Sequence, residues 1–412
     1  MTVPPVPAGG LEIRPFTSGD DLELEFALRR RSFGAISPAD KPRWRASVQA
    51  SVDAGEILGA FDGGRLVASA RYFRMQQWWH GRSLPMAGVA GVKVAPEERG
   101  RGVGRAIMTE LLGEICRREY PVSTLYPSTL PIYRSLGWEI AGGLYEAVIP
   151  ARALSALAGP DPVLGGGTAG GGNAPGLRRA EAGDEHAVTD ILGLVHRELR
   201  HRGPITRPHA DTARWLANED RFSYLADDGV LSYRWSGGHD ELHVDLLAAS
   251  SAATIRAFWR ILSSHATMAR TVRATLAPDD PVTWFLREPD IAVGCEHNWM
   301  LRLLDPVRAI DGRGFPSGAA VAVQLELTDA ARPGNSGRWT LEVGGGAGKL
   351  APAVGTADGS ALRLGARGFA ALFAGVPVAT LRRTGLVVGG DVTADGALDC
   401  AFGGTAFMTD YF

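Results

Sequence analysis

One stretch of this 412-residue chain constrains its fold more than any other. It reads Gly91-Val-Lys-Val-Ala-Pro-Glu-Glu-Arg-Gly-Arg-Gly-Val-Gly-Arg105. Alternating apolar residues up to Val94 predict a strand, and apolar residues at helical spacing after Gly102 predict a helix. Backbone N–H groups that converge where a helix begins form a binding site for anions. The stretch therefore predicts an α/β core with a phosphate-binding turn.

The composition of this turn suits a pyrophosphate. Its glycines let a ligand approach the backbone closely, and its arginines can neutralise phosphate charge. The helix that follows adds the positive end of its dipole. The predicted ligand-binding residues of the turn are Arg99, Gly100, Arg101, Gly102, Val103, Gly104 and Arg105. A plain strand–turn–helix junction without a ligand is the alternative for this motif taken alone.

The strand before the turn offers a second contact. An arm that carries amides can pair with a strand edge, and we expect Val92, Lys93 and Val94 to provide that edge. One free N–H group there can also face a thioester oxygen.

A tyrosine follows the turn about thirty residues further along the chain. Tyr133 lies on a short predicted helix over 130–136 and is a candidate proton donor. Tyr126 on the preceding strand is its rival, and an ordinary core aromatic is the alternative for Tyr133. Ser128 and Thr129 are expected either to contact the arm of the ligand or to cap the short helix.

The chain as a whole is predicted to be an α/β (α+β) protein of three parts, with boundaries at 1–150, 151–304 and 305–412. The glycine- and proline-rich residues 159–177 read as a linker. The second part repeats the strand and helix order of the first. It lacks the glycine turn, however, and is expected to bind no cofactor.

The last residues of the chain, Ala406-Phe-Met-Thr-Asp-Tyr-Phe412, are apolar and aromatic. Most termini are polar and frayed. We therefore expect this terminus to dock against another part of the molecule.

The motif Val-x-Val-x-Pro-x-x-Arg-x-x-Gly-x-Gly with Tyr133 downstream resembles the GCN5-related N-acetyltransferase (GNAT) superfamily. The three-part chain resembles its Eis (enhanced intracellular survival) family, which implies tandem GNAT-like domains and a sterol-carrier-protein-like C-terminal domain. The resemblance implies acetyl-CoA as co-substrate, with Arg99, Gly102 and Gly104 at the pyrophosphate. It also implies that Tyr133 protonates the departing thiolate and that the terminal carboxylate of Phe412 acts as the base.

The same resemblance implies an acceptor. Eis-family enzymes acetylate amino groups of polycationic small molecules such as aminoglycosides, often at several positions, in a wide acidic cavity. Phe33, Trp44 and Asp410 are the candidate substrate-binding residues, with ordinary packing as the alternative for the aromatic pair. Gly34-Ala35 replaces an acidic residue that the family often carries, so the acceptor preference is expected to differ.

Two other functions remain open. One is acetylation of protein lysines or polyamines, and the other is lipid binding by a chain whose GNAT core is vestigial. The net charge of −2 and the absence of a long apolar run predict neither a nucleic-acid nor a membrane partner. Three distant cysteines predict no metal site, and the start of the chain predicts a cytoplasmic location. The resemblance implies a homo-hexamer built as a dimer of trimers.

Overall fold

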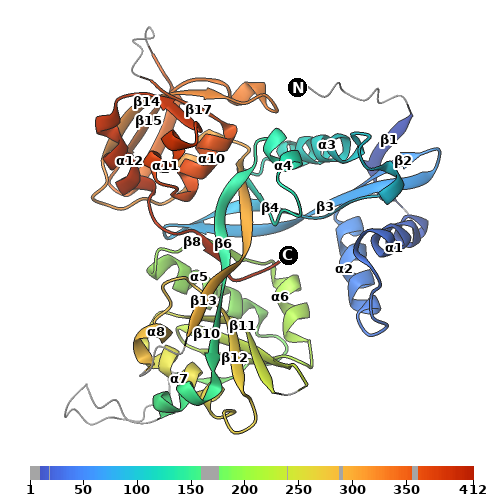
Figure 1. Cartoon of the computed structure of the whole chain (residues 1–412), viewed down its shortest axis with the longest axis vertical. Helices are drawn as coiled ribbons and strands as arrows, with labels where there is room; N and C mark the ends of the chain where they lie inside the picture. Colours follow the sequence, from blue (N-terminus) through green and yellow to red (C-terminus); the bar gives the residue numbers. More distant parts are fainter. Residues whose placement is uncertain (1–9, 18, 159–175, 239, 287–290, 355–360) are drawn as a thin grey trace.

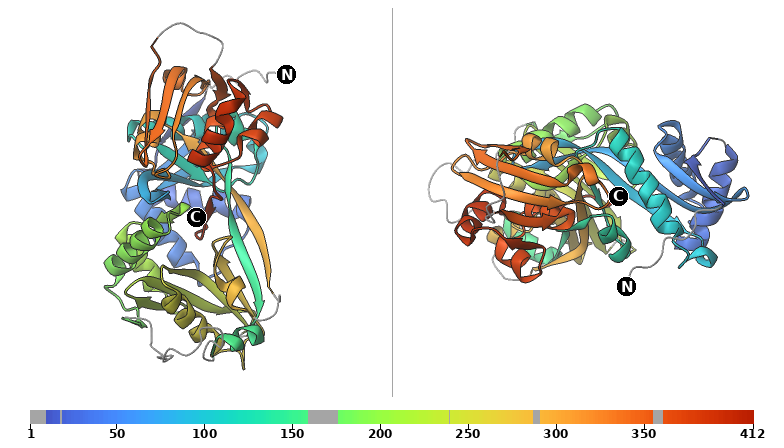
Figure 2. Two further views of the ribbon diagram at one scale, coloured as in Figure 1. Left: turned by 90° about the vertical axis from the view of Figure 1, so that its left-hand side faces the viewer. Right: turned by 90° about the horizontal axis from the view of Figure 1, so that it is seen from above.

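The computed structural model describes residues 10–17, 19–158, 176–238, 240–286, 291–354 and 361–412 (Figure 1). Residues 159–175 of the predicted linker lie outside these ranges. The described helices include none that is long and apolar enough to cross a membrane. Figures 1 and 2 show the three parts arranged around the C-terminus, which lies near the middle of the molecule.

The first part contains the predicted strand–turn–helix unit. Its elements are β1 (Leu11–Pro15), α1 (Gly19–Phe33), α2 (Lys41–Asp53), β2 (Ile57–Asp62), β3 (Arg65–Trp79), β4 (Arg82–Val94), α3 (Val103–Arg117), β5 (Val122–Leu125), α4 (Pro131–Ser135) and β6 (Glu139–Pro150). Helix α3 buries Val103, Ile107, Leu111 and Ile115, the residues whose spacing predicted it. This apolar stripe packs against the sheet and fixes where the helix begins.

The second part repeats this order in outline. Its elements are β7 (Arg178–Arg179), α5 (Glu185–Glu198), β8 (Arg202–Thr206), α6 (His209–Leu216), β9 (Phe222–Ala226), β10 (Gly229–Ser236), β11 (Glu241–Ala249), α7 (Ala252–Ser263), β12 (Thr271–Leu276), α8 (Val282–Phe285) and β13 (Ala292–Leu303). Helix α7 follows β11 as α3 follows β4, but Ser251 rather than a glycine caps it, and its side chain accepts a hydrogen bond from the Thr254 N–H at 3.2 Å.

Two long strands are exchanged between these parts. Strand β6 of the first part pairs with β12 of the second, and β13 of the second part lies between β5 and β6. A single sheet of 14 strands results, and β6 and β13 cross from one part to the other side by side (Figure 1).

The third part is built on a separate five-stranded sheet of order β16-β15-β14-β17-β18. Its elements are α9 (Pro306–Gly312), β14 (Val321–Thr328), β15 (Gly337–Gly344), β16 (Ala347–Pro352), β17 (Leu362–Gly365), α10 (Ala366–Ala374), α11 (Val378–Arg383), β18 (Val387–Gly389), α12 (Asp395–Phe402) and β19 (Phe407–Met408). The alternating apolar residues of β14 and β15 pack into the main core cluster of the chain.

A buried arginine joins this part to β3. Arg313 is fully buried and donates to the carbonyl oxygens of Phe373 and Phe402, which lie at the C-terminal ends of α10 and α12. Its guanidinium also lies within 5.5 Å of four aromatic ring centroids, including that of Trp79 in β3. Burial lowers the pKa of Arg313, and the two helix dipoles and the aromatic faces favour its charge.

Residues 403–412, here called the C-terminal segment, leave α12 and enter the middle of the molecule. Within it, β19 pairs in parallel with Gly143 and Leu144 of β6, and the N–H of Gly143 donates to the Ala406 carbonyl at 3.2 Å. A side chain at Gly142 would collide with this carbonyl. Gly142 therefore lets the segment lie directly on the exchanged strands.

Candidate active site

The glycine turn between β4 and α3 contains left-handed residues. Gly100 and Gly102 have φ angles of +80° and +81°, a left-handed conformation that favours glycine, and Gly102 caps the N-terminus of α3. A Cβ atom on Gly100 would meet nothing within 4 Å, so this side of the turn is open. The described ion pairs join Arg101 to Glu98 but include none from Arg99 or Arg105.

Packing requires a glycine at position 104. A Cβ atom there would lie 3.3 Å from Cγ2 of Val94 and 3.2 Å from Cδ1 of Ile132. This glycine therefore lets α3 approach both β4 and α4 closely, whatever it contributes to a ligand.

Strands β4 and β5 separate beside this turn. They pair in parallel only from Met86 opposite Val122 to Val89 opposite Leu125. A bulge follows in β4, where Gly91 has φ +59° and the register against β3 shifts. Beyond Val89, no described strand pairs with this edge of β4. The predicted edge at 92–94 is thus open to an arm that carries amides.

The side chain of Lys93 is not available to contact a ligand at this strand edge. It is buried, forms an ion pair with Glu25 at 2.6 Å and donates to the Gly91 carbonyl at 2.8 Å. Burial lowers the pKa of Lys93, and the nearby carboxylate of Glu25 opposes that shift. Only the backbone of Lys93 is therefore available at the strand edge.

Tyr133 lies on α4 with its ring buried in the core of the first part. Burial raises the pKa of its phenol, and a hydrogen bond with the side chain of Ser128 opposes that shift. Helix α4 has no side-chain cap. Ser128 thus supports the phenol rather than capping the helix, while Thr129 makes neither described contact.

The C-terminal segment ends at the separation of β4 and β5. The Phe412 ring lies against Gly88, where a Cβ atom would meet it at 2.7 Å. Its centroid is 5.5 Å from that of Tyr126, whose hydroxyl donates to the Asp410 carbonyl at 2.8 Å. Tyr126 therefore holds the segment, a role that the sequence reasoning missed although this residue directly follows β5.

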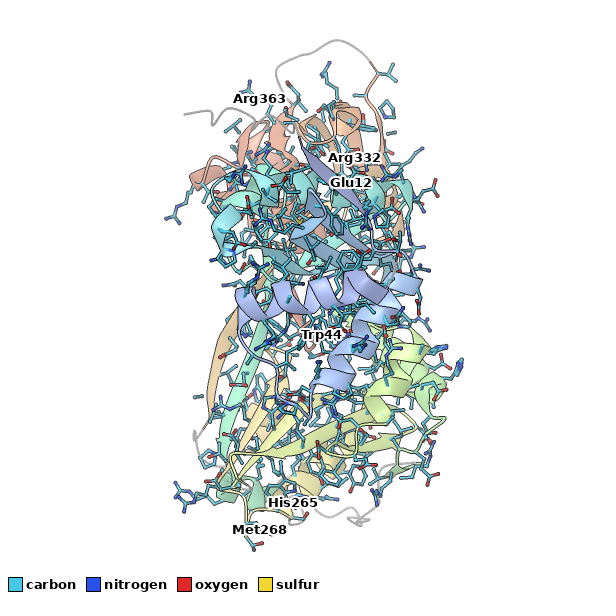
Figure 3. The ribbon with its side chains drawn as sticks, turned by 90° about the vertical axis from the view of Figure 1, so that its right-hand side faces the viewer. Glu12, Trp44, His265, Met268, Arg332 and Arg363 are labelled. Carbon is cyan, nitrogen blue, oxygen red and sulfur yellow. The ribbon has the colours of Figure 1, made fainter. Side chains whose placement is uncertain are left out.

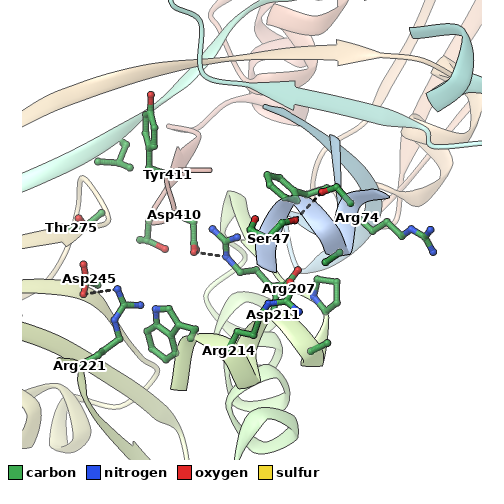
Figure 4. Close-up of a pocket in the computed structure, with 18 of the residues that line it drawn as sticks. Ser47, Arg74, Arg207, Asp211, Arg214, Arg221, Asp245, Thr275, Asp410 and Tyr411 are labelled. Atoms are coloured by element: carbon green, nitrogen blue, oxygen red, sulfur yellow. Dashed lines mark hydrogen bonds and ion pairs between the residues drawn. The ribbon is translucent and has the colours of Figure 1, made fainter. Parts of the chain in front are cut away.

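A cavity of about 1140 Å³ lies between the first two parts, next to this terminus (Figure 4). Asp410 and Tyr411 line it, together with residues from α2, α6 and the strands of the second part. Its carboxylates are Asp53, Glu56, Glu146, Asp211, Asp245, Glu296 and Asp410, and its arginines are Arg74, Arg207, Arg214, Arg221 and Arg234.

The charges of this cavity are largely paired. Each of its arginines contacts one of its carboxylates, as between Arg207 and Asp410 at 3.1 Å and between Arg221 and Asp245 at 3.2 Å (Figure 4). The lining holds seven carboxylates and five arginines, and one of the carboxylates, Glu146, is paired with Arg273 outside the lining. The cavity is therefore mixed in charge with an acidic excess, rather than uniformly acidic.

The two predicted aromatic wall residues lie elsewhere. Phe33 is 55% exposed at the end of α1, and Trp44 on α2 packs against Phe26 with ring centroids 5.1 Å apart (Figure 3). Neither lines the large cavity. A contact of either residue with substrate stays a prediction.

The described residues include no group of three or more His, Cys, Asp or Glu that could hold a metal ion.

Three family models match successive parts of the chain. An acetyltransferase (GNAT) domain matches residues 12–141, a second acetyltransferase (GNAT) domain matches 203–303, and a sterol carrier protein domain matches 306–408. The matches follow the order of the three parts of the fold.

Relatives cover nearly the whole chain. The chain is 28% identical to N-acetyltransferase Eis of Mycobacterium tuberculosis, over 82% of this chain and 84% of that protein. It is 27% identical to an uncharacterized N-acetyltransferase of Streptomyces griseus, over 89% and 90%. A crystal structure of a GCN5-related N-acetyltransferase from Kribbella flavida is 41% identical, covers 98% of each chain and has a TM-score of 0.89. A second, from Anabaena variabilis, is 22% identical with a TM-score of 0.82 over 98% of this chain and 100% of that one, and shows the same fold.

Proposed function

Because this chain belongs to the GCN5-related N-acetyltransferases and is an enzyme of their Eis type, we propose that it transfers the acetyl group of acetyl-CoA to amino groups of polycationic small molecules. Aminoglycosides, acetylated at more than one position, are the first candidates. The observation that carries the proposal is the meeting of the glycine turn, the open edge of β4 and the end of the chain at one place.

The residues of the first part fit acetyl-CoA. The N–H groups at the start of α3 and the side chain of Arg99 bind the pyrophosphate, and the edge of β4 at 92–94 pairs with the pantetheine arm. The thioester that acetyl-CoA supplies then lies near the opening between β4 and β5. One free N–H group of that edge stabilises the thioester oxygen.

Tyr133 is the proposed proton donor. The Ser128 hydroxyl can donate to the phenol oxygen, which leaves the phenol proton free for the departing thiolate. Tyr126 is less suited, because its hydroxyl already donates to the Asp410 carbonyl.

The terminal carboxylate of Phe412 is the proposed base. The contacts of its ring with Gly88 and Tyr126 bring the end of the chain to the opening. A carboxylate there attracts an ammonium and accepts its proton.

The size and charge of the large cavity favour a bulky cationic acceptor. Its volume of about 1140 Å³ is above the usual range of small-molecule pockets, roughly 300–1,000 Å³. The excess of carboxylates attracts cations. The hexamer and the cytoplasmic location implied by the Eis resemblance stay predictions.

The proposal is tested by acetyl-CoA turnover with separate panels of aminoglycosides, polyamines and lysine-containing peptides. We expect aminoglycosides to give the highest kcat/KM and to be acetylated more than once, as read by mass. A preference for peptides or polyamines would replace the acceptor in this proposal. Hydrolysis of acetyl-CoA without transfer to any amine would contradict it.

The Tyr133→Phe variant tests the proton donor. We expect kcat to fall about 100-fold, near the low end of the usual effect of general acid catalysis, with little change in KM for acetyl-CoA. Steady-state kinetics measures both constants. Tyr126→Phe is the comparison variant, because it removes the rival phenol, and it should lower kcat less than Tyr133→Phe does. Equal activity of Tyr133→Phe and wild type would place the proton donor elsewhere.

The Gly102→Ala variant tests the turn. A residue with a side chain in the left-handed region costs about 1–2 kcal/mol, so the turn should relax away from its binding shape. We expect KM for acetyl-CoA to rise about tenfold while kcat stays near wild type. Gly345→Ala in the turn between β15 and β16 is the control, since Gly345 is also left-handed, with φ +58°, and a Cβ atom there meets nothing within 4 Å. If both variants behave alike, Gly102 does not shape the site.

A further inference from the structure

A second cavity lies beside α3, where the first part meets the third. Its volume is about 550 Å³. One wall is a single face of α3 that carries Arg105, Thr109 and Cys116, and the opposite wall includes Ala331 and Arg332 of the third part. The two walls come from segments more than two hundred residues apart in the sequence.

This cavity begins next to the phosphate-binding turn. Arg105 is the third residue of α3, directly after the left-handed Gly102 that caps the helix. Thr109 lies one turn further along the same face. A ligand whose pyrophosphate lies at the turn and whose amide arm follows β4 can therefore reach this cavity with the group on the other side of the pyrophosphate.

The cavity holds two arginines for which no ion pair is described. Arg332 hydrogen-bonds the Cys116 thiol, and burial raises the pKa of that thiol, so the partner is neutral at physiological pH. The described ion pairs include none from Arg332 or Arg105, although neighbouring arginines are paired. Arg134 and Arg367 both contact Glu139, each at 2.7 Å.

The carboxylate of Asp329, in the same loop as Arg332, is already engaged. Both oxygens of Asp329 lie 2.7 Å from Nη2 of Arg302. Oδ1 of Asp329 also accepts the backbone N–H of Arg332 at 3.0 Å, and Asn335 donates to Oδ2 at 3.0 Å. These contacts hold the loop in place while leaving the guanidinium of Arg332 without a described anionic partner. A fixed loop that presents a cation loses little freedom when an anion binds.

We propose that this cavity binds the 3′-phosphoadenosine end of coenzyme A, with Arg332 and Arg105 contacting the 3′-phosphate. The inference rests on the proposed use of acetyl-CoA and extends it to a residue of the third part. A phosphate monoester carries close to two negative charges and matches two arginines. The C-terminal part then contributes directly to recognition of the co-substrate.

Titration calorimetry with coenzyme A and 3′-dephospho-coenzyme A tests this assignment, because the two molecules differ only in that phosphate. We expect wild type to bind coenzyme A about tenfold or more tightly than the dephospho form, as for a charged hydrogen bond. Arg332→Gln should lose most of this preference, because only Arg105 remains at the phosphate, and should bind the dephospho form as wild type does. Arg363→Gln is the control, since Arg363 is an exposed arginine elsewhere on the same part (Figure 3).

The outcomes separate the two proposals. If wild type binds neither nucleotide, the proposed function fails together with this inference. If wild type binds both equally, or if Arg332→Gln keeps the wild-type preference, only the assignment of this cavity is overturned. A melting curve of Arg332→Gln that matches wild type shows that its loss of preference is not a loss of folding.

Discussion

A chain extended by three residues beyond Phe412 is expected to lose kcat by about 1,000-fold, within the usual range for loss of a general base, while its Kd for acetyl-CoA changes little. The extension turns the terminal carboxylate into a peptide group, which has no charge and accepts no proton from an ammonium. It must also pass through the opening of β4 and β5, against which the Phe412 ring is packed. Steady-state kinetics with the best amine and calorimetry with acetyl-CoA measure the two quantities.

A three-residue extension before Met1 serves as the control for this experiment, since it leaves the terminal carboxylate unchanged. A second variant, Tyr126→Phe, removes only the hydrogen bond to the Asp410 carbonyl. It should lower kcat less than the C-terminal extension, because the Phe412 ring keeps its contact with Gly88. Full kcat in the chain extended after Phe412 would exclude the terminal carboxylate as the base.

The local features of the site were predictable because short segments determine them. The glycine spacing required a left-handed turn, and the apolar stripe of α3 required a helix that begins where Gly102 ends the turn. The apolar terminus predicted docking, and the Phe412 ring does pack against the core. Its place at Gly88 was not predictable, since nothing near residue 412 specifies a partner more than three hundred residues away.

The strand exchange was not predictable from the sequence for a different reason. Strand β6 alternates along most of its length, whereas β13 is exposed in its first half and buried in its second, and neither pattern identifies a neighbouring strand. The large cavity forms only because the exchange brings the two parts together. Arg207, Asp211 and Asp245 carried no motif in the sequence, and they become cavity residues through this arrangement.

The Asp329→Asn variant should destabilise the protein by about 3–5 kcal/mol, the usual cost of leaving one member of a buried ion pair without its partner. Arg302 is 0% exposed and Asp329 3%, so water cannot replace the lost charge. Arg302 lies in the exchanged strand β13 and Asp329 follows β14, so the pair ties the third part to the exchanged sheet. For a chain of this length we expect the melting temperature to fall by about 5 °C.

Asp395→Asn provides the matched control for this effect. Asp395 pairs with Arg382 at the same distance of 2.7 Å, but both side chains are 21% exposed. Partly exposed pairs contribute at most about 1 kcal/mol, so the melting temperature should hardly change. If the two variants have the same melting temperature, the buried pair contributes no more to stability than the partly exposed one.

The Asp329 side chain also accepts a hydrogen bond from the backbone N–H of Arg332. Asp329→Asn should therefore also weaken the preference for coenzyme A over its 3′-dephospho form, whereas Asp395→Asn should leave that preference intact.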